Sequence, residues 1–210
     1  MTRQKKLILL IINIMLLIME IIGTIFCFID GGIAALRYYT VLSNIMCGVI
    51  SIIYIFVLLK NMNVDDFVVF KWIKMLRFLV VVCLMVTFIV VVTVLIPTNG
   101  ASSISRYLFE RANLFHHLLC PLFMTITYIV LEKEVKLGRR EEMFTLIPTI
   151  LYAIVTLTLN ILRVMEGPYP FLYVYEQSVF ESIIWVVVII GGAYALAMGL
   201  NKLNSIGGNK

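Results

Sequence analysis

Two adjacent histidines, His116 and His117, stand at the start of a long apolar run of the sequence. An ionisable side chain inside a bilayer is costly, so it usually has a functional reason to be there. The unperturbed pKa of imidazole is close to neutral, which allows a histidine to accept and return a proton during catalysis. Our candidate for the hydroxyl that such an imidazole would activate is that of Thr40, in another segment. This pair predicts nucleophilic acyl transfer, with Thr40 as the nucleophile and His117 as the general base.

The spacing of polar residues sharpens this hypothesis. Thr40 and Asn44 are four residues apart, as are Asn113 and His117, so each pair shares one face of a helix. Pro121 cannot donate a hydrogen bond to the His117 carbonyl, and we therefore expect the helix to bend beneath this histidine. Asn44, Asn113 or nearby backbone N–H groups could stabilise the oxyanion of an acyl transfer.

The elements that must position these residues are membrane-spanning helices. The chain is 62% hydrophobic and only 14% charged, and six apolar stretches of about 20 residues are each long enough to cross a bilayer. They lack the alternation of barrel strands. The sequence thus predicts an all-α, polytopic integral membrane protein whose residues 1–210 form one six-helix domain. The expected spans are 7–29, 38–59, 78–96, 112–131, 143–162 and 179–200.

Basic residues predict the orientation of these spans. Thirteen Lys and Arg residues fall in the two tails, in the connection Lys60–Arg77 and in the fourth connection, whereas four fall on the opposite side. Both termini are therefore expected to be cytoplasmic. We read Arg77 as part of a cytoplasmic connection and Glu142 as a solvated charge. The net charge of +5 then reflects topology and anionic lipid headgroups, not a nucleic-acid partner.

With this orientation, the polar residues of the spans gather in the outer leaflet, and the inner halves hold few strongly polar residues. We expect one polar pocket that opens outward. Besides the catalytic pair, its candidate residues are Ser43, Asn44, Asn113, His116, Glu20, Asn160, Arg163 and Glu181.

Structural interpretations stay open beside the catalytic one. Thr40 could simply bond to a carbonyl of its own helix. His116 is expected to face away from His117 and to anchor at the membrane interface. Glu20 and Glu181 could form ion pairs with Arg163 or with Arg37.

No metal or cofactor is expected. Adjacent helical residues point about 100° apart, so the two histidines are poorly placed to share an ion. The four cysteines lie in predicted spans without metal-ligand spacing, which is typical of free buried thiols.

The outer connection between the fifth and sixth spans is rich in aromatic residues and proline. Its candidates for a lid over the pocket are Tyr169, Pro170, Phe171 and Tyr173. An aromatic belt at the level of the lipid headgroups is the alternative interpretation.

Three short motifs resemble the androgen-induced membrane hydrolase family, and above all its bacterial six-helix relatives. The motifs begin at Tyr38, Asn113 and Tyr169, and they read YYTVLSN, NLFHHLLCP and YPFL. The resemblance implies a threonine nucleophile at Thr40, a histidine base at His117, hydrolysis of fatty-acid esters of hydroxy fatty acids and a place in a bacterial cytoplasmic membrane. His116 departs from the animal members, which have an apolar residue at this position.

The sequence thus favours an integral membrane lipid-ester hydrolase that needs no cofactor and acts on membrane lipids or fatty-acyl esters. A membrane acyltransferase with the same pair is one alternative. A non-enzymatic transporter or ligand-binding membrane protein is another. The oligomeric state is left open.

Overall fold

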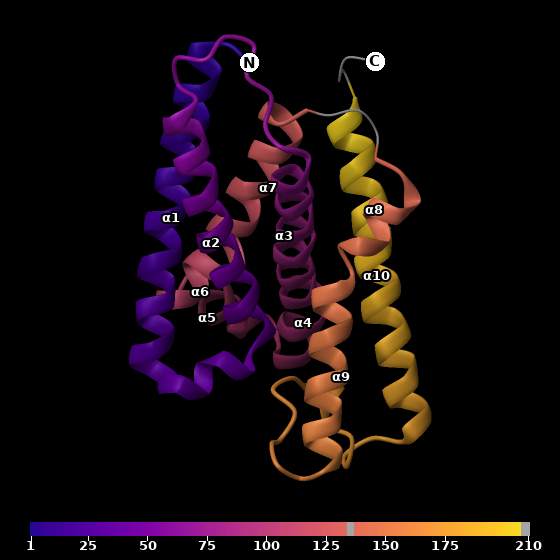
Figure 1. Cartoon of the computed structure of the whole chain (residues 1–210). Coiled ribbons are helices and arrows are strands. Elements are labelled where there is room, and N and C mark those ends of the chain that lie inside the picture. The colour runs from indigo at the N-terminus through magenta and orange to yellow at the C-terminus, as the bar shows by residue number, and fades with distance from the viewer. Residues whose placement is uncertain (134–136, 207–210) are drawn as a thin grey trace.

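The computed structural model describes residues 1–133 and 137–206 as an all-α bundle (Figure 1). Within these residues, six helical segments are long and apolar enough to cross a membrane, in agreement with the six predicted stretches. This confirms the predicted all-α, multi-pass architecture. The segments are Arg3–Arg37, Tyr39–Lys60, Lys71–Asn99, Arg111–Leu131, Arg139–Ile161 and Val179–Ser205.

Several segments combine more than one type of helix. The first consists of α1 (Arg3–Gly31) and a 3₁₀ turn, η1 (Gly32–Arg37), and the second is α2 (Tyr39–Lys60). The third joins α3 (Lys71–Val90), a π-helical segment, η2 (Val91–Leu95), and α4 (Ile96–Asn99). The fourth joins α6 (Arg111–Asn113), a second π-helical segment, η4 (Leu114–Leu119), and α7 (Cys120–Leu131). The other elements are η3 (Ala101–Ser103), α5 (Ile104–Leu108), α8 (Arg139–Phe144), α9 (Ile147–Ile161), η5 (Pro170–Leu172) and α10 (Val179–Ser205).

Helix α3 lies in the middle of the bundle, between the α1–α2 pair and the α9–α10 pair (Figure 1). Every residue from Phe78 to Leu84 is buried. A helix that is apolar on all sides is expected at the centre of a bundle. Helix α1, in contrast, has a lipid-facing stripe of exposed apolar residues at helical spacing: Leu7, Ile11, Ile14, Ile18, Ile21 and Ile25.

Both described chain ends lie at the same end of the bundle, which we call the terminal end (Figure 1). Here the amino group of Met1 donates to the Phe67 carbonyl at 3.2 Å, and Lys133 donates to the carbonyl of Ile206. The opposite end, which we call the cleft end, contains residues 32–38, 99–111 and 162–178. The side of the membrane on which each end lies stays a prediction, and "outer connection" is kept only as the name of residues 162–178.

A buried polar network near the terminal end corrects the expectation that the inner halves hold few polar residues. Arg77 is completely buried, although we placed it in a cytoplasmic connection. Because α3 already begins at Lys71, Arg77 falls in its second turn and faces the core. Its guanidinium forms an ion pair with Glu132, donates to Asn13 Oδ1 at 2.6 Å and lies 4.4 Å from the Tyr54 ring centroid.

Glu142 is a second correction in the same region. It is buried, not solvated, and its carboxylate accepts a hydrogen bond of 2.6 Å from Asn201 Nδ2. Nearby, the buried Lys6 ammonium donates to the carbonyls of Asn61, Met62 and Val64. Buried charges are tolerated when such partners surround them.

Candidate functional site

Thr40 is the second residue of α2, and it is buried beneath the outer connection. Its carbonyl accepts hydrogen bonds from Ser43 Oγ at 3.0 Å and from Asn44 Nδ2 at 2.7 Å. The Asn44 amide also donates to the His116 carbonyl at 3.2 Å. Thr40 and Asn44 thus lie on one helix face, as predicted, and the Asn44 amide ties the first turn of α2 to η4.

His117 lies in η4, where the helix departs from α geometry. We expected a bend caused by Pro121, and the structure accommodates this proline with a π-helical turn. The Nδ1 atom of His117 lies 2.8 Å from the Tyr107 carbonyl oxygen of α5. Because a carbonyl only accepts, Nδ1 carries the proton, and Nε2 of the neutral ring is left as the acceptor. This is the tautomer that a general base requires when Nε2 faces the substrate.

Helix α5 therefore orients the side chains of both Asn113 and His117. The Asn113 amide donates to the Arg106 carbonyl at 2.8 Å, one residue before the carbonyl that contacts His117. Sequence reasoning treated this segment as a plain connection. A backbone carbonyl carries no residue-specific signal, so this support could not be found in the sequence.

Thr40 and His117 line the same cleft at the cleft end of the bundle, as the sequence predicted. The cleft has a volume of about 650 Å³. Among the described residues, no hydrogen bond joins Thr40 to His117. Catalytic hydrogen bonds are often long in unliganded sites and tighten only when the substrate is present. The cleft is also lined by Cys27, Asp30, Arg37, Arg106, Asn113, His116, Tyr169, Pro170 and Tyr173.

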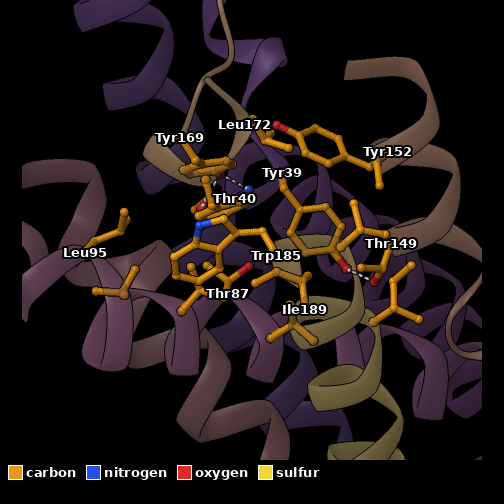
Figure 2. A pocket seen from close by; sticks show the side chains of 17 residues that line it. Tyr39, Thr40, Thr87, Leu95, Thr149, Tyr152, Tyr169, Leu172, Trp185 and Ile189 are labelled. Atoms are coloured by element: carbon orange, nitrogen blue, oxygen red, sulfur yellow. Dashed lines mark hydrogen bonds between the residues drawn. The ribbon is translucent and has the colours of Figure 1, made fainter. Parts of the chain in front are cut away.

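A second, apolar pocket meets the cleft at Thr40, Leu95 and Tyr169, which line both. Its volume is about 50 Å³, against about 650 Å³ for the cleft, so it is far smaller. Figure 2 shows the side chains that line this second pocket, among them Trp185 and Ile189 of α10 and Leu172 of the outer connection. The walls are almost entirely apolar, and the remaining lining comes from α2, α3, η2 and α9.

The outer connection covers Thr40 in the manner of the predicted lid. Tyr169 and Phe171 are buried and stack with ring centroids 5.2 Å apart. The Tyr169 hydroxyl lies 3.3 Å from the Thr40 backbone nitrogen and 3.4 Å from its Oγ1. Gly167 permits the tight packing, because a Cβ atom there would lie 2.5 Å from the Leu172 carbonyl oxygen. Within the outer connection, Tyr175 fits the aromatic-belt interpretation, because its exposed fraction is 58%.

Six of the eight supporting residues expected in the pocket do not line the cleft. Ser43, Asn44 and Glu20 are buried in the bundle, and the other three lie around the outer connection. Asn160 donates to the Met165 carbonyl and accepts from the Val174 backbone N–H, so it holds the base of the outer connection. The Arg163 guanidinium lies over the Tyr175 ring at 4.5 Å. Glu181 is exposed and forms a capping box with Ser178 at the start of α10.

The alternative in which Glu20 and Glu181 form ion pairs with Arg163 or Arg37 is not the arrangement found. Glu181 serves as a helix cap, and Glu20 lies 3.5 Å from His116. His116 itself is not an interface anchor, because its exposed fraction is 1%. The wider π-helical turn directs its ring towards α1.

The amides that we expected to stabilise an oxyanion are already engaged with carbonyls. Asn44 and Asn113 both donate to backbone oxygens, as does the Ser43 hydroxyl. The hydroxyl that lies beside the Thr40 side chain is instead that of Tyr169, which is 3.4 Å from Thr40 Oγ1 and accepts from the Thr40 backbone N–H. Within the described part of the chain, no group of three or more His, Cys, Asp or Glu side chains is arranged to hold a metal ion.

Comparisons with known proteins add no assignment: no protein family, curated protein or solved structure shows a significant match to this chain.

Proposed function

We propose that the protein is an integral membrane lipid-ester hydrolase in which Thr40 is the nucleophile and His117 the general base. The observation that carries this proposal is the position of Thr40. Its side chain stands where the small apolar pocket meets the polar cleft, and His117 lines that cleft. A fatty-acyl ester has the same division, with an apolar chain on one side of its carbonyl carbon and a polar alcohol on the other.

In the proposed reaction, Thr40 and His117 act together in two steps, acylation and hydrolysis. His117 Nε2 accepts the proton of the Thr40 hydroxyl while Oγ1 attacks the ester carbonyl. The imidazolium then protonates the departing alkoxide, which leaves an acyl ester on Thr40 and a free alcohol. Water, activated by the same imidazole, hydrolyses the acyl ester and restores the threonine. The Tyr169 hydroxyl is placed to donate a hydrogen bond to the developing oxyanion.

Charges at the mouth of the cleft favour a substrate whose polar part is anionic. Arg37 and Arg106 both line the cleft and are exposed. The carboxylate of Asp30 is engaged by Arg111 at 2.9 Å. Guanidinium groups bind carboxylates well. This supports the substrate implied by the family resemblance, an ester of a hydroxy fatty acid, which has a free carboxylate.

Movement of the outer connection as a lid would let an acyl chain enter a pocket as small as this one. Tyr169, Phe171 and Leu172 form one wall of the apolar pocket. A displacement of the outer connection therefore widens the pocket and releases the hydrogen bonds between Tyr169 and Thr40 at the same time.

A fluorophosphonate probe tests the proposal directly, because it labels activated hydroxyl nucleophiles. Labelling of the purified protein that disappears in Thr40→Ala supports the hydrolase. Product analysis with and without a lysolipid acceptor separates hydrolysis from acyl transfer by the same pair.

One observation favours a second candidate, a ligand-binding or transport protein without enzymatic activity. In the structure the Thr40 hydroxyl contacts Tyr169 and not an imidazole. A binder would retain the cleft and its arginines but show no probe labelling at Thr40.

A further inference from the structure

A second nucleophile and a second imidazole face the same cleft. The Sγ atom of Cys27 lies 3.5 Å from His116 Nδ1, within the range for a thiol hydrogen bond. On the other side of the ring, His116 Nε2 lies 3.5 Å from Glu20 Oε2. The side chains of His116 and Glu20 are 1% and 3% exposed, whereas Cys27 is only partly buried and lines the cleft.

Helix α1 is shaped to receive this ring. Glu20, Gly23 and Cys27 are separated by three and four residues, so they share one helix face. A Cβ atom at Gly23 would lie 2.5 Å from His116 Nε2 and 2.6 Å from Cδ2. Only glycine lets the imidazole lie directly against the backbone, between the carboxylate and the thiol. The backbone of α1 at Gly23 therefore forms part of the site, together with the side chains of Glu20 and Cys27.

The thiol contact at Nδ1 is compatible with either tautomer of His116, and its Nε2 and both Glu20 carboxyl oxygens are buried without a hydrogen-bond partner among the described residues. With the proton on Nε2, which lies 3.5 Å from Glu20 Oε2, the ring N–H points towards an acceptor. The lone pair of Nδ1 then faces the thiol and can accept its proton. Glu20 is also approached by the thiols of Cys47 and Cys120, but these cysteines and Cys83 are fully buried. Cys27 is the cysteine that combines an imidazole contact with access to the cleft.

We propose that Cys27 is a second acyl-accepting nucleophile of this cleft, with His116 as its base and Glu20 as the residue that positions His116. The acyl donor is a fatty-acyl ester. In the reaction, the thiol proton moves to His116 Nδ1 while Sγ attacks the ester carbonyl carbon. The bond from that carbon to the alcohol oxygen breaks, and the imidazolium returns its proton to the departing alkoxide. The products are a thioester on Cys27 and a free alcohol.

This proposal does not rest on catalysis by Thr40, and the two acyl-enzymes differ chemically. Neutral hydroxylamine cleaves a thioester but leaves an oxygen ester intact. The test uses the full-length protein in detergent and the p-nitrophenyl ester of octanoic acid. Intact-mass spectrometry measures the covalent acyl group, and the p-nitrophenolate burst gives the acylation rate.

We expect one acyl group that neutral hydroxylamine removes. It should be absent from Cys27→Ala and present in Thr40→Ala. Cys83→Ala is the matched control, since it removes a cysteine away from the cleft, and it should acylate like the unmodified protein. His116→Asn should slow the burst by roughly 10²-fold or more, the usual contribution of a general base. Glu20→Gln should lower the burst rate while the ester concentration for half-maximal rate stays unchanged, which a general loss of packing would not produce.

Several results would overturn the proposal. If the only acyl group found resists hydroxylamine and disappears in Thr40→Ala, acylation is confined to Thr40. Complete absence of an acyl group, or an undiminished thioester in Cys27→Ala, excludes Cys27. A normal burst in a folded His116→Asn excludes the base. If His116→Asn does not fold, Cys27→Ala still decides the question, because it removes only a partly exposed thiol.

Discussion

The hydroxyl of Tyr169 lies 3.4 Å from the hydroxyl of Thr40 and 3.3 Å from its backbone nitrogen, although the two residues are 129 positions apart. This contact links the outer connection to the first turn of α2. Burial raises the pKa of the Tyr169 phenol above its ordinary value of 10.0, and the hydrogen bonds with Thr40 offset part of that rise. The phenol therefore stays protonated near neutral pH and remains a donor for the site.

Tyr169→Phe should reduce stability at neutral pH by about 0.5–1.5 kcal/mol, as for one hydrogen bond. The raised pKa adds a pH dependence. Above pH 10 the unfolded phenol ionises while the folded one keeps its proton, so stability is lost as pH rises through the folded-state pKa. Between about pH 8 and about pH 11, the melting temperature in detergent should fall more steeply for the unmodified protein than for Tyr169→Phe. Tyr175→Phe, at an exposed phenol, is the control.

Thr40→Ala should abolish ester turnover and fluorophosphonate labelling while the fold persists. The loss of one hydroxyl beside a polar cleft should cost only about 1 kcal/mol of stability. Thr93→Ala is a matched control, because Thr93 is an exposed helical threonine that bonds only to its own helix. Undiminished labelling of Thr40→Ala would remove the proposed mechanism.

His117→Ala should lower ester turnover by roughly 10²–10⁴-fold, the contribution expected of a general base. If the polar cluster is structural instead, the pattern inverts. His117→Ala would then lower the melting temperature markedly, by leaving the Tyr107 carbonyl without its partner, and Thr40→Ala would be nearly silent. Turnover and thermal unfolding, measured on both variants, separate these cases.

The sequence predicted the spans well because the thickness of a bilayer demands long apolar runs, and their ends differ from the structure mainly in polar flanking turns. Depth and helical spacing also placed Thr40 and His117 on one cleft. The roles of His116 and Arg77 were wrong for a common reason. Side-chain direction depends on where a π-helical turn falls and where a helix begins, and neither is marked by the apolar pattern.

Orientation in the membrane is the part of the architecture that needs experiment. We expect the terminal end to be cytoplasmic because basic residues gather there. In a Cys27→Ala background, a membrane-impermeant maleimide should label Glu176→Cys in intact cells and Arg139→Cys only after permeabilisation. The reverse pattern would invert the topology and move the cleft to the cytoplasmic side.

Arg77 and Glu132 form a buried ion pair that the apolar pattern of α3 gave no reason to expect. Removing one partner leaves an uncompensated buried charge, so Arg77→Met or Glu132→Leu alone should cost about 3–5 kcal/mol. The double variant Arg77→Met, Glu132→Leu should recover most of this loss, because two apolar side chains can replace a buried pair at little cost.

Lys71 and Glu141 supply the control: they lie 3.7 Å apart with the Lys71 side chain 83% exposed, and Glu141→Gln should cost no more than about 1 kcal/mol. Unfolding in detergent measures all four variants. Additive losses in the double variant would mean that Arg77 is held mainly by Asn13 and Tyr54, and not by Glu132.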